Sequence, residues 1–292
     1  MAIIALFVLG ALLAPLIATH DPNQTDFVGR FLPSSRNHPL GTDHVGRDVF
    51  ARILHGGRLS LGMALTATAG ITAVGIVLGL AAAFSGRLVE TLIMRTVDVL
   101  LAMPTLILAL VIVGLLGQGL RNLIITIILV QWPRYARLVR GMALKVRERD
   151  FVEAGRAAGA GKTRLIVRHI LPNLIGPVVV FSTIDMGTTL LAVSGLSFLG
   201  FGVAPPTPEW GAMLSEARFQ IDRAPLLLVF PGAAITLVVL AFNLAGDGLR
   251  DLLDPRTRSV QLSRRERREA RRPARPEPAA GRKQARAARQ TA

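Results

Sequence analysis

The segment Gly159-Ala160-Gly161-Lys162-Thr163 is the part of this chain that comes nearest to a catalytic motif. A glycine followed by Lys-Thr ends the phosphate-binding loop of nucleotide hydrolases, in which backbone N–H groups hold phosphate oxygens and the lysine balances their charge. That loop needs another glycine five residues before Gly161, where this chain has Arg156, and a β-strand ahead of it. Residues 151–158 instead show helical spacing of apolar side chains. The sequence therefore predicts no nucleotide binding here and assigns any ATP chemistry to a partner.

The sequence gives little support for thiol or metal chemistry. The chain has no cysteine, and its five histidines show no metal-ligand spacing. We expect no disulfide, no resident metal and no cofactor. Asp185 is the one ionisable side chain near the middle of a long apolar segment, and an intramembrane carboxylate usually faces a bundle interior or a water-filled path. Two interpretations follow. Asp185 lines a translocation pathway, or it forms a hydrogen bond between helices without meeting the substrate.

The composition indicates a membrane protein. Of the 292 residues, 51% are hydrophobic and 18% are charged, which is too apolar for a water-soluble enzyme of this size. A helix needs about 20 apolar residues, at ~1.5 Å rise each, to cross a hydrocarbon core. Six stretches qualify: 1–18, 59–86, 99–120, 120–138, 172–193 and 224–246. In the fourth, Arg134 and Arg137 would extend to the headgroup level. The predicted fold class is all-α, a polytopic membrane protein with six transmembrane helices.

The distribution of basic residues predicts the orientation. Lys and Arg number 34 against 19 Asp and Glu, and most of them fall within 87–95, 134–168 and the tail after residue 250. Basic connections stay in the cytoplasm, so both termini are predicted to be cytoplasmic. The first span lacks the basic start and the cleavage site of a signal peptide, so we expect a retained helix. The abrupt start at Met1 suggests that a short basic leader is missing.

The connection between the fourth and fifth spans contains two short helical patterns separated by Gly159 and Gly161. Their apolar positions are Phe151, Ala154, Ala157 and Ala158, then Leu165, Ile166 and His169. Glycine permits a sharp turn, and Pro172 is expected to end the second helix where the chain re-enters the bilayer. A helical hairpin that projects into the cytoplasm is typical of a docking element.

This hairpin resembles a known motif. The spacing of Glu153-Ala154-Gly155, then Gly159, then Leu171-Pro172 is similar to the EAA loop of the membrane subunits of bacterial ABC importers. Two positions depart from that pattern: Gly155 replaces an alanine, and His169 replaces an isoleucine. Three further segments, 38–49, 195–202 and 246–256, together with 168–173, resemble the second permease of the dipeptide, oligopeptide and nickel branch. Where members of that branch often carry Glu-Ala, this chain has Val193-Ser194.

The resemblance implies a type I ABC importer permease, which is not itself an enzyme, in the inner membrane of a bacterium. Its implied partners are a homologous permease, two ATP-binding cassette ATPase subunits and an extracytoplasmic substrate-binding protein. The two permeases would form a pathway for peptides, nickel chelate or a related small solute. The residues implied to couple transport to the ATPase are Glu153, Ala154, Gly155, Gly159, Leu171 and Pro172.

Two other function classes remain as alternatives. An ion- or proton-coupled secondary transporter usually carries several ionisable residues within its spans and needs no docking hairpin. A membrane-anchored scaffold would act through its basic tail. The sequence also leaves the choice of cargo open.

We expect four parts along the chain. They are a first transmembrane helix (1–19), an extracytoplasmic segment (20–58), a core of five transmembrane helices (59–256) that includes the coupling loop 139–173, and a disordered basic tail (257–292). The tail has almost no large apolar residues, so it cannot bury a core. Attraction to anionic lipid headgroups, about 1 kcal/mol per charge, accounts for it better than nucleic-acid binding.

Three features outside the loop have open interpretations. The charged residues of 20–58 form either a docking surface for a binding protein or a solvated cap of mutually paired charges. Trp210 is more consistent with an aromatic anchor at the membrane interface than with a substrate contact. Gly75 and Gly79 indicate close helix packing, within this chain or against a partner permease.

Overall fold

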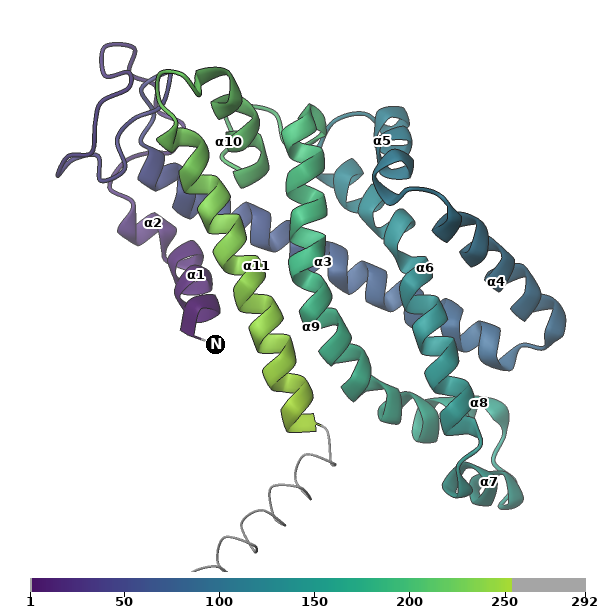
Figure 1. The fold of residues 1–292 in the computed structure, drawn as a ribbon. Coiled ribbons are helices and arrows are strands. Elements are labelled where there is room, and N and C mark those ends of the chain that lie inside the picture. Colours follow the sequence, from purple (N-terminus) through teal and green to yellow (C-terminus); the bar gives the residue numbers. More distant parts are fainter. Residues whose placement is uncertain (1, 254–292) are drawn as a thin grey trace, which may run out of the picture. The chain divides into compact units, whose positions relative to one another are not determined.

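The computed structural model describes residues 2–253, and this part of the chain is built from α-helices joined by irregular segments (Figure 1). The helices are α1 Ala2–Leu12, α2 Ala14–Ile17, α3 Val49–Phe84, α4 Arg87–Ala102, α5 Thr105–Leu116, α6 Leu120–Arg147, α7 Asp150–Ala157, α8 Lys162–Leu165, α9 Leu171–Leu196, α10 Trp210–Ala217 and α11 Leu226–Leu253. The predicted tail 257–292 and the expectation about Met1 lie outside the described residues.

Helices α3, α6 and α9 form the centre of the compact unit Met1–Arg250. α3 runs through most of the unit in Figure 1 and packs against α6, α9 and α1. The hairpin of α7 and α8 lies at the end of the unit opposite to residues 20–48. Buried apolar side chains of these central helices, including Ile71, Leu123 and Val193, form the main core cluster.

Three helical segments in the described chain are long and apolar enough to cross a membrane: Val49–Phe84, Lys162–Phe201 and Leu226–Leu252. A fourth arises if α4 and α5, which meet at 100°, are one bent span. The prediction of an uninterrupted helix over 99–120 is therefore wrong. Proline disfavours helical dihedrals in the residue before it, and Met103, with ψ 141°, is extended ahead of Pro104.

The helix on the C-terminal side of the hairpin does not end at Pro172, contrary to the prediction. α8 continues through a π-helical turn, Ile166–Ile170, directly into α9. Pro172 lies at the start of α9, directly after this π-helical turn, so the irregular hydrogen bonding of that turn accompanies the missing backbone N–H. The result is one helical segment from Lys162 to Phe201, so the second arm of the hairpin is the start of the fifth predicted span.

Gly75 and Gly79 bring α3 against α6 of the same chain. A Cβ atom on Gly75 would lie 2.2 Å from Cβ of Tyr135, and one on Gly79 would lie 2.8 Å from the carbonyl oxygen of Ala136. No side chain fits at either position unless the two backbones separate. The sequence left open whether these glycines pack within this chain or against a partner permease. Both pack against α6 of the same chain.

We predict that Gly75→Leu lowers the stability of the folded chain by about 1–3 kcal/mol, the usual cost of overpacking a close contact. Thermal unfolding of the purified protein in detergent measures this effect. Gly62→Leu on the same helix is the control, because a Cβ at Gly62 meets no atom within 4 Å. Equal melting temperatures for the two variants would contradict the prediction.

Candidate functional site

The hairpin is formed by α7, a glycine turn and α8. Asp150 and Glu153 lie in the first turn of α7, where carboxylates complement the positive end of the helix dipole. Gly159 ends the helix with φ 79°, a conformation that favours glycine. The Ala160 N–H donates to the Gly155 carbonyl at 3.1 Å, and the Gly159 N–H donates to the Arg156 carbonyl at 3.0 Å. These two bonds make a Schellman motif, which fixes the direction of the turn.

One face of α7 is buried and the other is open. Val152 is fully buried and packs with Leu165 and Ile170 in the cluster that joins the hairpin to the end of α6. Glu153 and Ala154 are exposed. The outward face of α7 therefore offers a carboxylate and a small apolar side chain to solvent or to a partner, while the inward face holds the hairpin to the helical core.

The six predicted coupling residues separate into two groups. Glu153, Ala154, Gly155 and Gly159 share α7 and its turn, whereas Leu171 and Pro172 belong to the first turn of α9. Four of the six are exposed, and Gly155 and Leu171 are half-buried. Gly155 also has a packing role, because a Cβ there would lie 3.0 Å from Cδ2 of Leu165. This contact gives a physical reason for the glycine found in place of the alanine of the EAA pattern.

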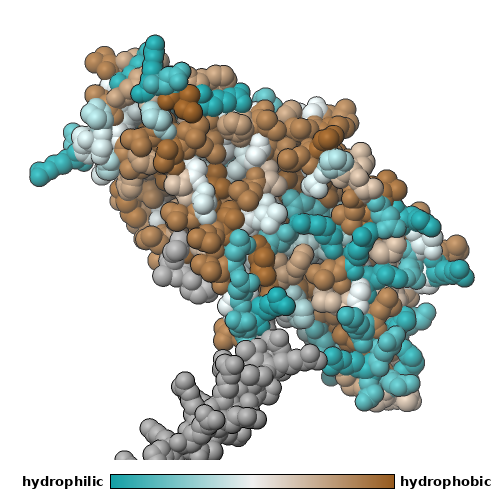
Figure 2. All heavy atoms as spheres, in the orientation of Figure 1, coloured by the Kyte–Doolittle hydropathy of each residue, from teal (hydrophilic) through white to brown (hydrophobic). Residues whose placement is uncertain are grey.

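A cavity of about 650 Å³ lies beside the hairpin. Its basic lining residues are Arg87, Arg147, Arg156 and Lys162, and Glu90, which is bound to Arg140, also lines it. Figure 2 shows that hydrophilic residues gather at this end of the unit, whereas hydrophobic residues cover the side of α1 and α11. The hairpin surface is thus polar and largely basic, which suits contact with water or a protein partner.

Asp185 lies at a junction between α6 and α9. Its Oδ1 accepts a hydrogen bond from Arg134 at 2.7 Å and its Oδ2 accepts one from the Tyr135 hydroxyl at 3.1 Å. Asp185 is 5% exposed, so its buried charge is matched by a cation and a second donor. The guanidinium of Arg134, which the sequence analysis expected at the headgroup level, reaches across to α9.

Three charged residues of the predicted extracytoplasmic segment, Asp43, Arg47 and Arg52, are buried and form a network with Glu216. Arg47 binds Asp43 at 2.6 Å and Glu216 at 2.5 Å, and Arg52 donates to the Pro206 carbonyl at 3.0 Å. Arg47 and Arg52 are 4% and 2% exposed. The charges pair with one another as one interpretation proposed, but they are not solvated. They instead join the segment before α3 to the segment around α10.

Glu209 is a structural residue that the sequence analysis did not single out. Its carboxylate accepts hydrogen bonds from the backbone N–H groups of Gly211 and Ala212 and from the Ser60 hydroxyl, all at 2.8–2.9 Å. Glu209 is fully buried and caps α10. Burial raises its pKa above the usual range, against the effect of these hydrogen bonds. The sequence signal for this role is a glutamate that directly follows a proline-rich run and precedes a helical pattern, which is a position where a side chain can cap a helix.

The prediction that Trp210 anchors the chain at a membrane interface is wrong. Trp210 is 1% exposed, and its indole N–H donates to the Ile53 carbonyl at 2.9 Å. Gly56 and Gly57 leave room for the ring, since a Cβ on Gly57 would lie 2.8 Å from it. The indole is therefore a packing element that locks α10 onto the first turns of α3.

Residues 75–259 match the model of a protein family described as "Binding-protein-dependent transport system inner membrane component". The chain belongs to this family. The match covers the C-terminal end of α3 and all of α6 and α9, together with the hairpin and Asp185.

The sequence similarity to known relatives extends over most of the chain. It is 44% identical to the dipeptide transport system permease protein DppC of Alkalihalophilus pseudofirmus over 257 residues, covering 88% of this chain and 84% of the relative. It is also 44% identical to the nickel transport system permease protein NikC of Escherichia coli K12 over 253 residues, covering 87% and 91%. A solved structure of the MetNI methionine ABC transporter, in an inward-facing conformation, shares the fold with a TM-score of 0.58 and 18% identity, covering 70% of this chain and 97% of that one.

We predict that Glu209→Ala lowers the stability of this transport component by about 1–3 kcal/mol, because buried N–H donors lose their acceptor. Asp222→Ala, an exposed acidic position of the same connection, is the control for thermal unfolding. The raised pKa sets the sign of the pH dependence: the contribution of Glu209 is largest below its unfolded pKa and falls as pH rises through its folded pKa. Glu209→Ala should therefore lose most relative to the parent chain at low pH. A uniform loss at all pH values would contradict this sign.

Proposed function

We propose that this chain is one of two permease subunits that form the translocation pathway of an ATP-driven importer for peptides or a nickel chelate. The observation that carries the proposal is the 44% identity to both a dipeptide permease and a nickel permease over nearly the whole chain. Because the two identities are equal, they do not choose between the cargoes. In the proposed system an extracytoplasmic binding protein makes that choice and delivers the solute.

The proposed topology has six spans with both termini in the cytoplasm. Three long apolar segments and the bent pair of α4 and α5 supply four of them. α1 with α2 and the apolar N-terminal half of α6 would supply the other two. This arrangement places the basic hairpin on the cytoplasmic side and the buried charge network of residues 43–52 on the opposite side. A bacterial inner membrane is the proposed location.

In the proposed mechanism, two ATP-binding cassette subunits supply the energy, and one of them binds the hairpin of this chain. Glu153 and Ala154 on the outward face of α7 would make the contact, Gly155 and Gly159 would set its shape, and Leu171 with Pro172 would join it to α9. ATP binding closes the ATPase pair, and the docked hairpins shift the two permeases from inward to outward access.

The ion pairs of the described helices argue against a proton-coupled carrier. Asp185 is held by Arg134, and Asp98 is bound to Arg137 at 2.5 Å. A proton-coupled carrier usually has several ionisable residues available within its spans, whereas both of these carboxylates are engaged by arginines of the same chain. The ATP-driven interpretation requires neither carboxylate to carry a proton or an ion across the membrane.

We predict that Gly159→Val separates ATP hydrolysis from uptake in the reconstituted importer. Valine is strained at φ 79°, a penalty of about 1–3 kcal/mol, so the turn and the outward face of α7 shift. ATP-dependent solute uptake and phosphate release, measured on the same proteoliposomes, should show lost uptake with persisting hydrolysis.

Gly161→Val is the matched control for this variant. Gly161 has φ −65°, and a Cβ atom there would meet no other atom within 4 Å, so a side chain fits without strain. Full uptake by Gly159→Val would refute the coupling role of the turn. Proteoliposomes that contain this chain without ATPase subunits should move no solute, and solute transport by them would refute the proposed function as a whole.

We also propose that Asp185 contributes to the pathway through its junction with Arg134. Asp185→Asn should reduce uptake or alter substrate preference, because it leaves the guanidinium without its carboxylate. Asp98→Asn removes a similar but exposed pair and should leave uptake close to that of the parent chain. Unchanged uptake and unchanged substrate preference in Asp185→Asn would contradict the pathway role. The interhelical hydrogen bond would then be the only role of Asp185.

A further inference from the structure

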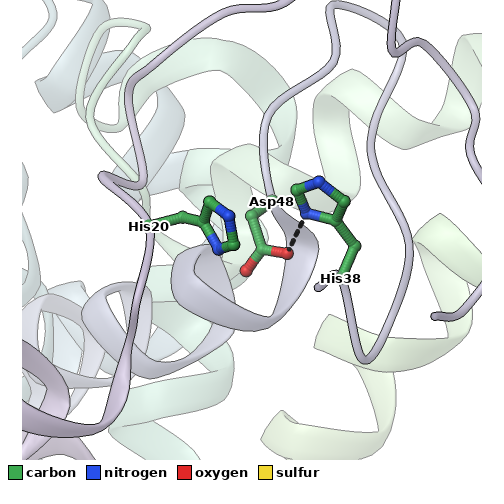
Figure 3. A group of neighbouring side chains, drawn as sticks. All are labelled: His20, His38 and Asp48. Carbon is green, nitrogen blue, oxygen red and sulfur yellow. Dashed lines mark hydrogen bonds and ion pairs between the residues drawn. The ribbon is translucent and has the colours of Figure 1, made fainter. Parts of the chain in front are cut away.

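Three potential metal ligands from separate parts of the chain converge in the segment that precedes α3 (Figure 3). His20 follows α2, His38 lies in the irregular connection, and Asp48 is the residue before α3. One ligand atom from each lies within 4.8 Å of the others. The two imidazole rings are 4.6 Å apart between centroids, with an interplanar angle of 34°. Figure 3 shows both rings beside the Asp48 carboxylate.

The carboxylate of Asp48 is fixed in place. Asp48 is 4% exposed, and its Oδ2 accepts the Ala51 N–H at 2.7 Å as the cap of α3. Its Oδ1 lies 2.9 Å from Nδ1 of His38. Ligand atoms at about 2.0–2.2 Å from one metal ion stand roughly 3.0–3.4 Å apart in tetrahedral or octahedral geometry. This pair therefore needs only a small adjustment to share an ion.

The surroundings carry the charge that a cation requires. A cavity of about 230 Å³ adjoins the three residues, and among the described residues its lining includes Asp21 and Asp26 but no lysine or arginine. The whole chain, by contrast, has a formal net charge of +15. Thr19 Oγ1 lies 3.1 Å from Nδ1 of His20, and a partner of this kind orients a ligating imidazole by accepting its other N–H.

We propose that His20, His38 and Asp48 bind a divalent transition-metal ion of the Zn²⁺ or Ni²⁺ type. Neutral imidazole nitrogens suit these ions, whereas Mg²⁺ and Ca²⁺ prefer oxygen ligands. Three protein ligands leave a position for water or a small solute. The bound ion joins the segment after α2, the irregular connection and the start of α3. The proposal does not depend on the transport function.

A neighbouring group has similar spacing, but its carboxylates are already paired with a cation. It consists of Asp43, His44 and Glu216. Asp43 and Glu216 are already bound to the guanidinium of Arg47. A metal ion there would have to displace a buried cation. The His20 group has no such competitor among the described residues that line its cavity, so the structure favours it over the His44 group.

The test measures metal binding directly on the full-length chain, free of any tag, in detergent after chelator treatment. Isothermal titration with Zn²⁺ and with Ni²⁺ should give one tight equivalent per chain for at least one of these ions, and Mg²⁺ should give none. Thermal unfolding should shift to higher temperature with the bound ion. His20→Ala should weaken affinity at least tenfold and abolish the thermal shift.

Two controls make the outcome decisive. His44→Ala and His55→Ala should keep the affinity of the parent chain, since neither belongs to the proposed ligand set. His20 is half-buried and contributes no helix cap, so His20→Ala tests the site even if His38→Ala or Asp48→Asn fails to fold. The proposal is overturned if neither ion binds, if His20→Ala binds as the parent does, or if His44→Ala is the variant that loses binding.

Discussion

The close approach of α3 and α6 is the contact on which the rest of the helical core depends. Gly75 and Gly79 let the two backbones meet, and this places Tyr135 between α3 and α9. Tyr135 then packs its ring against Phe181 at 4.9 Å and bonds Asp185 through its hydroxyl. Without the glycines, α6 would stand further from α3, and its polar side chains would not reach α9. The close backbone approach at these two glycines thus positions the polar junction of the core.

Buried charge is handled by pairing throughout the described chain. Asp185 is matched by Arg134 within the helices, and Arg47 with its two carboxylates is matched before α3. Glu209 differs from these residues, because its carboxylate is bound by backbone N–H groups and a hydroxyl instead of a cation. Burial raises its pKa. These arrangements join segments far apart in the sequence. They give the non-helical connections a defined structure that apolar packing alone would not specify.

Local features could be predicted from the sequence, and contacts between distant segments could not. Helical spacing indicated α7, and a glycine at its end indicated a turn, because both depend on neighbouring residues. The break at Pro104 is also a local signal, although the absence of charge over 99–120 by itself predicts an uninterrupted helix. The burial of Trp210 and the convergence of His20 with Asp48 depend on the path of long irregular connections. No spacing rule within one segment reports such proximity.

The continuity of α8, its π-helical turn and α9 has a mechanical consequence. The helical segment from Lys162 to Phe201 has 40 residues, which at ~1.5 Å per residue gives a contour length of about 60 Å, with a kink at Gly200 near its far end. The far end of this segment adjoins α10, where Gly211 packs against Ser194 and Ser197. A displacement at the α7 end is therefore carried to the opposite end without passing through a loop that would absorb it. The π-helical turns, Pro177 and Gly200 are the places where this segment departs from a regular α-helix and could bend.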